Sequence, residues 1–274
     1  MSGLPTPRER AGQIIKKQVA AWDGVPTMDQ LNSVLRIAAM WRSTALAQTF
    51  IERTGGSVVA GGPFAGMTYV KAATEGALIA RLIGVYESEL HPHLEAFIAE
   101  DLECVIDVGC AEGYYAVGLA RRMPAVTVYA HDILENARVV CAGMAAENGV
   151  SDWVVIGGEF QPEDFQRFVG RRALVLVDAE GAELDILDPV RGPALAHMSI
   201  IVETHDVYRP GALASLMARF STTHDIERVD QDFKSYDAPD WVQNLSHLDQ
   251  LLTVWEWRQR PTPWLVMRPK SGRV

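Results

Sequence analysis

The stretch 107–113 has residue types and a spacing that suit a ligand-binding turn after an apolar run. It reads Asp107-Val-Gly109-Cys-Ala-Glu-Gly113. Gly109 permits a tight turn with close approach of a ligand to the backbone, and Gly113 lets the following helix start against the strand. About 25 residues later a second apolar run ends at Asp132. This is near the offset of ~20 residues at which an acidic side chain binds ribose hydroxyls.

The glycine spacing indicates a cofactor without a pyrophosphate. A dinucleotide turn reads Gly-x-Gly-x-x-Gly, whereas this turn has only Gly109 and Gly113, which disfavours a nicotinamide-dependent oxidoreductase. A turn that opens with a carboxylate suits a cationic ligand such as S-adenosylmethionine, with Asp107 facing the amino-acid end and Asp132 the ribose. The expected cofactor-binding residues are Asp107, Gly109, Ala111, Glu112, Gly113, Tyr115, His131, Asp132, Glu159 and Asp178. The alternative is that Asp107 caps the next helix and the glycines only shape the turn.

A second group of polar residues follows the apolar runs 173–177 and 199–202. Methyl transfer to a hydroxyl requires a base that accepts the proton as the oxygen attacks. The expected catalytic residues are His205, Asp178 and Glu180. His205 is the preferred base because the unperturbed pKa of histidine lies near the working pH. The alternative is a buried histidine that bonds to a neighbouring loop.

A divalent cation is the less favoured option at this place. If one binds, the expected ligands are Asp178, Glu203 and Asp206, since carboxylate oxygens suit hard cations. These acids can equally bind cofactor, substrate hydroxyls or backbone amides. The pair His91-Pro-His93 is better explained as a helix start than as a metal pair.

The elements that must position these residues alternate between strand and helix from residue 104 onward. Short apolar strands between helices indicate a parallel sheet covered on both faces. We therefore predict an α/β fold, a Rossmann-like doubly wound, mostly parallel seven-stranded sheet whose last strand is antiparallel. The expected strands are 104–108, 126–130, 153–156, 173–177, 199–202, 225–229 and 264–267. The expected helices are 114–122, 135–148, 162–169, 183–187, 210–220 and 245–258.

The first hundred residues read as helical. Capping-box patterns at Thr6 and Thr27 introduce helices over 11–22 and from 31 to about 54. Further helices are expected at 74–86 and 92–100. The glycine-rich stretch 57–67 between them is expected to be a loop, either a lid over the cofactor or an interhelical linker.

Residues 105–206 resemble the FkbM-like branch of class I methyltransferases. The resemblance is carried by Val105-Ile-Asp-Val-Gly-Cys-Ala-Glu-Gly-Tyr-Tyr115, Val128-Tyr-Ala-His-Asp132, Val177-Asp-Ala-Glu-Gly-Ala-Glu183 and Ile200-Ile-Val-Glu-Thr-His205. It implies an S-adenosylmethionine-dependent O-methyltransferase that acts on sugars or natural products. The chain departs from the family pattern at Ala111, where Asn is usual, and at Leu176, where Lys is usual.

On this resemblance residues 101–274 form the methyltransferase domain, with 230–262 as a lid-like insertion. Residues 1–100 form a helical N-terminal extension or lid. Trp241, Trp255, Trp257 and Trp264 are candidates for lining a substrate pocket, although packing in the core is the more common role of tryptophan.

Composition limits the partners. The 274 residues carry a formal net charge of −10, and the basic residues are scattered, which argues against nucleic acid. Three cysteines at unrelated spacings fit a reducing compartment. With no secretory segment and no run that could span a membrane, we expect a cytoplasmic location.

The expected activity is therefore methylation of a hydroxyl on a small molecule or saccharide. N- or C-methylation remains an alternative, as does a catalytically silent module that binds cofactor. The oligomeric state stays open, with a homodimer among the options.

Overall fold

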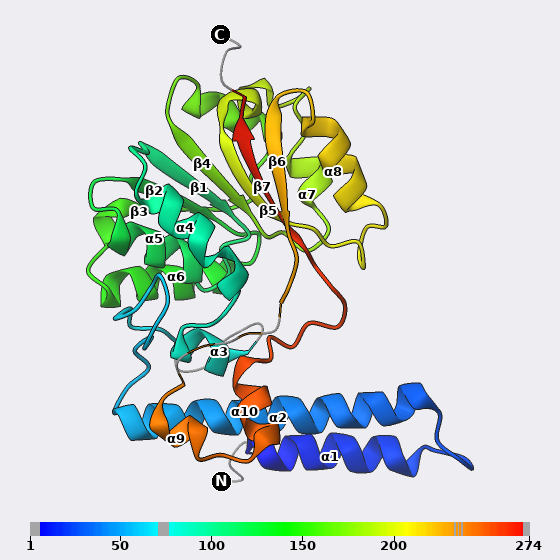
Figure 1. The fold of residues 1–274 in the computed structure, drawn as a ribbon. Helices are drawn as coiled ribbons and strands as arrows, with labels where there is room; N and C mark the ends of the chain where they lie inside the picture. The colour runs from blue at the N-terminus through cyan, green and yellow to red at the C-terminus, as the bar shows by residue number, and fades with distance from the viewer. Residues whose placement is uncertain (1–5, 71–76, 233, 235, 237, 271–274) are drawn as a thin grey trace.

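The predicted sheet forms a single layer of seven strands (Figure 1). In this computed structural model, which describes residues 6–70, 77–232, 234, 236 and 238–270, the strand order is β3-β2-β1-β4-β5-β7-β6. Adjacent strands from β1 to β5 are parallel, and β7 is antiparallel to both β5 and β6. The strands are β1 (Cys104–Val108), β2 (Thr127–His131), β3 (Val154–Gly157), β4 (Ala173–Val177), β5 (Ser199–Glu203), β6 (His224–Val229) and β7 (Trp264–Pro269). The predicted fold class is confirmed.

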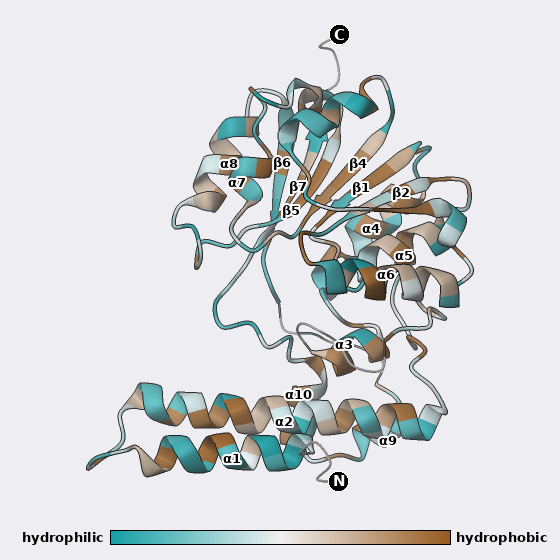
Figure 2. Cartoon of the chain, turned by 180° about the vertical axis from the view of Figure 1, so that it is seen from behind, coloured by the Kyte–Doolittle hydropathy of each residue, from teal (hydrophilic) through white to brown (hydrophobic). Residues whose placement is uncertain are grey.

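Each face of the sheet has its own apolar core, because successive side chains of a strand point to opposite faces. Val105 and Leu174 belong to one core, whereas Ile106 and Val175 belong to the other. The first core includes residues of α3 (Leu78–Ile83), α4 (His91–Ile98), α5 (Tyr114–Arg122) and α6 (Glu135–Glu147). The second includes residues of η3 (Pro162–Phe168), α7 (Glu183–Ile186), η4 (Pro193–His197) and α8 (Ala212–Phe220). Figure 2 shows apolar central strands, such as β1 and β4, between helices of mixed hydropathy.

The N-terminal segment forms a helical hairpin, α1 (Pro7–Ala20) and α2 (Met28–Thr54). Both predicted capping boxes are present: the hydroxyls of Thr6 and Thr27 accept from backbone amides, while Glu9 and Gln30 bond back to the caps. Helix α2 ends at Gly55 in the left-handed conformation, close to the predicted end.

A second layer, called the N-terminal layer below, lies beyond the carboxyl ends of the parallel strands (Figure 1). It is formed by two segments far apart in the sequence, 7–54 and 240–254. Helices α9 (Asp240–Gln243) and α10 (His247–Val254) lie beside α2. Arg42 of α2 makes a bidentate ion pair with Asp249 of α10, with both distances 2.7 Å. The layer therefore covers the edge of the sheet where the predicted site residues lie.

Three helical predictions need correction. The helix expected over 245–258 ends at Val254 in α10, and Trp257 has a positive φ of 66° that no helix accommodates. The segment 162–169 forms the 3-10 helix η3 rather than an α-helix. The helix expected over 74–86 is reduced to α3, followed by the short 3-10 helix η1 (Ser88–Leu90), and positions 71–76 lie outside the described residues. A further 3-10 turn, η2 (Ser151–Trp153), precedes β3.

The glycine-rich loop packs on α5. The ring of Phe64 lies over Gly118, and a Cβ atom on that glycine would stand 2.5 Å from the ring. The same ring packs edge to face on Tyr114, with 5.2 Å between the ring centroids. Arg122 of α5 donates to the carbonyl of Pro63 at 2.6 Å. The loop thus joins the N-terminal layer to the sheet domain.

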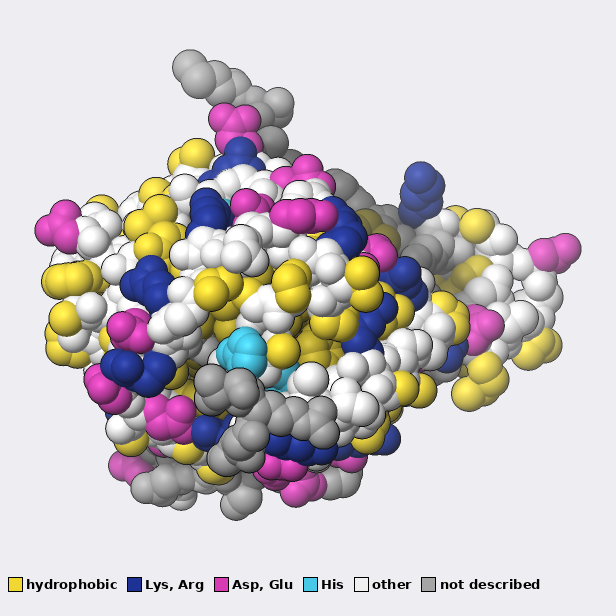
Figure 3. All heavy atoms as spheres, turned by 90° about the horizontal axis from the view of Figure 1, so that it is seen from above, with side chains coloured by type: hydrophobic (Ala, Val, Ile, Leu, Met, Phe, Trp, Pro, Cys, Tyr) yellow, Lys and Arg dark blue, Asp and Glu magenta, His cyan; other side chains and the backbone are white. Residues whose placement is uncertain are grey.

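The face at the amino ends of the parallel strands carries a mixed surface. Figure 3 shows Lys and Arg side chains interspersed with Asp and Glu over this face, without a large area of one sign. Among the described residues, every helix is too short or too polar to cross a lipid bilayer.

Candidate active site

A cavity of about 430 Å³ lies at the carboxyl ends of β1, β2, β3 and β4. The strand order reverses between β1 and β4, and ligands of doubly wound sheets bind at such a point. Six of the ten expected cofactor residues line the cavity, namely Gly109, Ala111, His131, Asp132, Glu159 and Asp178. The other four, Asp107, Glu112, Gly113 and Tyr115, are not among the residues that line it.

The turn after β1 approaches the backbone of β4 closely. Gly109 has a φ of +88°, and a Cβ atom there would stand 1.8 Å from the carbonyl oxygen of Asp178. Asp132 holds the turn from the other side, since its carboxylate accepts from the amides of Ala111 at 3.0 Å and Leu134 at 2.8 Å. Ala111 has a φ of +45°, a conformation that Asn adopts more readily than Ala.

Asp107 is a buried carboxyl group with no hydrogen bond of ordinary geometry to either oxygen among the described residues. Burial raises its pKa to about 8, with help from the charges of Asp178 and Asp132, while the backbone amide of Ala116 acts to lower it. A buried carboxylate without a partner is unfavourable. A cationic group bound at the turn would satisfy it, so Asp107 fits the amino group of an amino-acid ligand.

We expect Asp107→Asn to stabilise the ligand-free protein above pH 7. The folded pKa of Asp107 exceeds its unfolded value, so the unfolded chain binds fewer protons and stability falls as pH rises from about 4 to about 8. Asparagine removes this loss. Thermal unfolding should show a gain in Tm that is larger at pH 8 than at pH 5, since each kcal/mol shifts Tm by roughly 2–4 °C. An equal effect at both pH values would contradict the assignment.

Glu112 and Tyr115 point away from the cavity toward the N-terminal layer. Glu112 accepts a hydrogen bond from the hydroxyl of Tyr69 at 2.7 Å and lies 3.5 Å from the guanidinium of Arg81. The hydroxyl of Tyr115 donates to the carboxylate of Glu87. In this structure both side chains tie the layers together, and their role toward a cofactor stays a prediction.

Gly113, His131 and Glu159 shape the cavity in different ways. Gly113 has a φ of +95°, and a Cβ atom there would lie 2.7 Å from the sulfur of Cys141. The Nδ1 atom of His131 lies 3.1 Å from the carbonyl oxygen of Gly158, and burial lowers the pKa of this histidine. Glu159 is exposed at the rim, beside the cavity opening.

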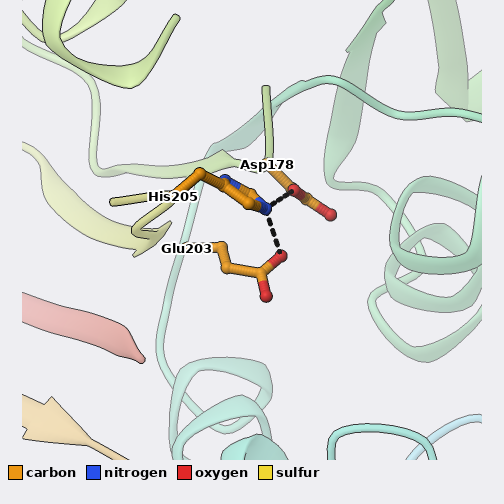
Figure 4. A group of neighbouring side chains, drawn as sticks. All are labelled: Asp178, Glu203 and His205. Atoms are coloured by element: carbon orange, nitrogen blue, oxygen red, sulfur yellow. Dashed lines mark ion pairs between the residues drawn. The ribbon is translucent and has the colours of Figure 1, made fainter. Parts of the chain in front are cut away.

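His205 lies among three carboxylates, of which Glu183 and Glu203 are buried and Asp178 is half-buried; Figure 4 shows Asp178 and Glu203. Its Nδ1–H donates to Glu183 Oε1 at 2.6 Å, and Glu183 is fully buried. The opposite nitrogen, Nε2, lies 3.4 Å from Glu203 Oε2 and 3.7 Å from Asp178 Oδ1. The carboxylate of Glu183, which accepts from Nδ1, fixes both the tautomer and the ring orientation of this histidine. Sequence reasoning missed Glu183 as a functional residue, although it ends the segment 177–183 that carried the family resemblance.

The surroundings make His205 a stronger base than a free histidine. Burial acts to lower its pKa, but the hydrogen bond to Glu183 and the charges of Asp178 and Glu183 outweigh burial, so the pKa is raised. The pKa of Asp178 is also raised, by burial first, against the opposing charges of His205 and Arg258. Glu180, with a positive φ of 41°, is exposed at the cavity wall.

The described residues contain one group that could hold a metal ion, Asp178, Glu203 and His205, whose ligand atoms lie within 4.8 Å of one another. The oxygen-only set expected from the sequence is corrected here. Asp206 turns away because its Oδ1 accepts from the amide of Gly211 at 2.6 Å. Glu203 also pairs with the guanidinium of Arg258. Because the positive charge of Arg258 already neutralises Glu203, this group of three residues suits proton transfer better than the binding of a metal ion.

Arg258 brings the segment after α10 onto the site, a contact that sequence reasoning missed. Its guanidinium pairs with the carboxylates of Glu87, Glu203 and Glu256, the last at 3.0 Å. Lys234 adds a second cation, 2.8 Å from Glu89 and also paired with Glu256. Burial raises the pKa of Glu87 to about 7, against the lowering effect of Arg258. These ion pairs join the N-terminal layer, β5 and the C-terminal segment.

We expect Arg258→Gln to lower the free energy of unfolding by about 3–5 kcal/mol, because it removes the cation that pairs with the buried carboxylates of Glu87 and Glu203. Urea denaturation at pH 7.5 measures the change. Arg172→Gln is a matched control, since Arg172 forms exposed ion pairs with Asp101 and Glu103 that contribute about 1 kcal/mol or less. Equal losses in the two variants would show that the Arg258 network is not a structural link.

The four candidate tryptophans are absent from the lining of this cavity. Trp264 is fully buried in the core, and Trp241 packs edge to face on Phe50 at 6.3 Å. Trp255 lies beneath the guanidinium of Arg36 at 5.4 Å, and it also contacts Trp257. Their positions indicate packing of the two layers.

Comparison with solved structures gives distant likenesses. No family model and no curated protein matches the chain. Among solved structures, an S-adenosylmethionine-dependent O-methyltransferase from Thermotoga maritima shares 13% identity at a TM-score of 0.45, with 69% of this chain and 67% of that chain covered. Cofactor-bound Rv0187 from MTB shares 13% identity at a TM-score of 0.46, with 98% of this chain and 100% of that chain covered. An rRNA methylase from Streptococcus thermophilus shares 15% identity at a TM-score of 0.42, with 66% of this chain and 96% of that chain covered.

These likenesses are too weak to transfer an activity, and the FkbM-like resemblance stays a prediction. The function must be argued from the residues of the site.

Proposed function

We propose that this protein is an S-adenosylmethionine-dependent methyltransferase that methylates a hydroxyl group of a small molecule or saccharide. The observation that carries the proposal is the buried carboxyl group of Asp107, whose oxygens make no hydrogen bond of ordinary geometry among the described residues, at a glycine turn at the switch point of the sheet. The turn lacks the glycines that a pyrophosphate requires. A ligand with a cationic amino-acid end and a ribose matches Asp107 and Asp132.

The cofactor would be held by residues from three strand ends. Asp107 would take its ammonium group, Asp132 its ribose hydroxyls, and the backbone at Gly109 would allow close approach. Apolar lining from Ile133 and Phe160 would take an aromatic base. When bound, S-adenosylmethionine supplies an electrophilic methyl group on a sulfonium, and the sulfur leaves as a neutral thioether that keeps the electron pair of the broken carbon–sulfur bond.

The chain's own task is to orient the acceptor and remove its proton. His205 Nε2 is the proton acceptor: the hydroxyl proton passes to it while the oxygen forms the new bond to carbon. Glu183 keeps the other nitrogen protonated and stabilises the resulting imidazolium. Asp178 and Glu203 lie next to Nε2 and can hold the acceptor hydroxyl toward it. Holding the two reactants in line supplies much of the rate enhancement.

Isothermal titration calorimetry with S-adenosylmethionine, S-adenosylhomocysteine and NAD tests the cofactor. Micromolar binding of the first two ligands, without binding of NAD, is the expected result. Failure of both sulfur ligands to bind would overturn the proposal. Transfer of a tritiated methyl group to a panel of hydroxylated sugars and phenols tests the reaction, with a matched panel of amines. Transfer to amines alone would replace O-methylation by N-methylation.

A further inference from the structure

The described lining of the cofactor cavity is acidic. It includes no lysine and no arginine, but it has five carboxylates, those of Asp132, Glu159, Asp178, Glu180 and Asp185. Burial lowers the pKa of His131, so this histidine adds little positive charge. Given the proposed function, on which this inference rests, the amino-acid end of the cofactor brings an ammonium group and also a carboxylate. Asp107 receives the ammonium group, whereas the carboxylate requires a cation from outside the lining, because a buried charge without a partner is unfavourable.

Arg81 of α3 is a buried cation beside the glycine turn. Helix α3 lies between the sheet and the N-terminal layer (Figure 1), and the side chain of Arg81 is only 8% exposed. Its guanidinium lies 3.5 Å from the carboxylate of Glu112, which directly follows Ala111 of the cavity lining. The charge of Arg81 also acts at the end of β4, where it opposes the rise that burial causes in the pKa of Asp178. The guanidinium thus lies near both strand ends of the switch point.

Asp107 and Arg81 lie on the same face of the sheet. Asp107 follows Val105 by two positions in β1, so both side chains point to the face whose core includes α3 and α5. The backbone amide of Ala116, in the first turn of α5, acts on the carboxyl group of Asp107. The guanidinium of Arg81 lies 5.8 Å from the ring centre of Tyr114, the first residue of the same helix. Both charged groups therefore lie at the amino end of α5.

The amino end of α5 favours an anion at this place. The helix runs for nine residues, and its first amides and the positive end of its dipole attract negative charge. The guanidinium of Arg81 adds a second positive group that one anion can bridge. Glu112 is such an anion, although its Oε1 also accepts from the hydroxyl of Tyr69 at 2.7 Å. A carboxylate of the ligand would be attracted by the same two positive groups.

Arg258 is less suited to this role, although its charge also acts on Asp178. Its guanidinium pairs with three carboxylates, those of Glu87, Glu203 and Glu256. Glu203 lies at the end of β5 beside His205 Nε2, which places Arg258 on the side of the site where the methyl acceptor must bind.

We propose that Arg81 binds the carboxylate of the cofactor's amino-acid end while Asp107 binds its ammonium group. The two opposite charges of the ligand are then received by two elements, α3 and β1. Because a guanidinium can bind a carboxylate through two parallel hydrogen bonds, this pairing fixes the direction of the amino-acid end as well as its place. The segment before β1 is therefore part of the cofactor site, and Arg81 selects ligands that carry a free carboxylate.

Isothermal titration calorimetry on the full chain tests this role with two ligands. The first is S-adenosylhomocysteine, and the second is S-adenosylthiopropylamine, in which a hydrogen replaces the carboxylate. Wild-type protein should prefer the first by about 10–100-fold, the usual effect of a hydrogen-bonded charge pair. Arg81→Gln should lose most of this preference, through weaker binding of S-adenosylhomocysteine alone. Arg121→Gln, at the other end of α5, is the matched control and should keep the preference.

The preference is a ratio within one variant, so a smaller folded fraction does not change it. Because Arg81 is buried, a second variant leaves it in place. Glu112→Gln removes the carboxylate that shares Arg81 with the ligand, so the preference should rise about tenfold. A preference that is unchanged in Arg81→Gln, or that does not rise in Glu112→Gln, would overturn the role of Arg81. Equal binding of the two ligands by wild-type protein would overturn it as well, whereas failure of both to bind would contradict the proposed function itself.

Discussion

Replacement of His205 by alanine is expected to lower kcat by about 10²–10⁴, the usual contribution of a positioned general base. The cofactor cavity is lined by other residues, so the affinity for S-adenosylhomocysteine should change little. His197→Ala is a suitable control, because His197 is exposed at the end of η4. Calorimetry and single-turnover methyl transfer separate the two effects. Unchanged turnover in His205→Ala would remove the base from the mechanism.

The pH dependence gives a second readout of the same residue. A general base must be unprotonated, so kcat/KM should rise with pH through the pKa of His205, which lies above its usual value. Glu183→Gln keeps an oxygen for the Nδ1–H but removes the charge that raises this pKa. The variant should have a lower kcat and an inflection shifted to lower pH. A purely structural role for Glu183 would reduce the amount of active protein without moving the inflection.

The sheet could be predicted because its strands are buried on both faces. β1 and β4 have the predicted bounds, as does α5. The runs of β1 and β4 are delimited by Glu103 and Gly109 and by Arg172 and Asp178, and glycine at 109 and 113 marks the turn between strand and helix. Local sequence thus specifies both the element and the place where its end meets the cavity.

The side of the turn that each residue faces could not be predicted. Ala111 and Glu112 are neighbours, but the first lines the cavity and the second faces Arg81 and Tyr69. Their directions depend on the positive φ of Ala111 and on the N-terminal layer, whose position is set by packing between distant segments. No periodic pattern in the turn carries that information.

Sequence analysis did not identify Arg258 as a site residue, because Arg258 lay at the end of a predicted helix. The run 245–258 has helical spacing, yet the chain leaves the helix after Val254 and brings Arg258 to Glu203. Pro261 and Pro263 follow closely and favour extended backbone before them, a signal that could have shortened the predicted helix. The pairing itself joins positions 55 residues apart and depends on the fold.

Gly109→Ala should have the largest effect on the cofactor site. A left-handed residue other than glycine is strained by roughly 1–2 kcal/mol. The added Cβ would also stand 1.8 Å from the carbonyl oxygen of Asp178, so the turn and the end of β4 must separate. We expect the affinity for S-adenosylhomocysteine to fall at least 100-fold, about 2.7 kcal/mol, together with a loss of stability of about 3–5 kcal/mol.

Gly143→Ala is the matched control for that change. Gly143 lies inside α6, and a Cβ atom there would meet nothing within 4 Å. Because alanine is the better helix former by about 1 kcal/mol, this variant should gain stability and bind the ligand normally. Urea denaturation and calorimetry on both variants give a direct comparison. If Gly109→Ala binds as tightly as Gly143→Ala, the turn at 107–113 does not form the cofactor site, because a ligand seated there must respond to the displacement of its backbone.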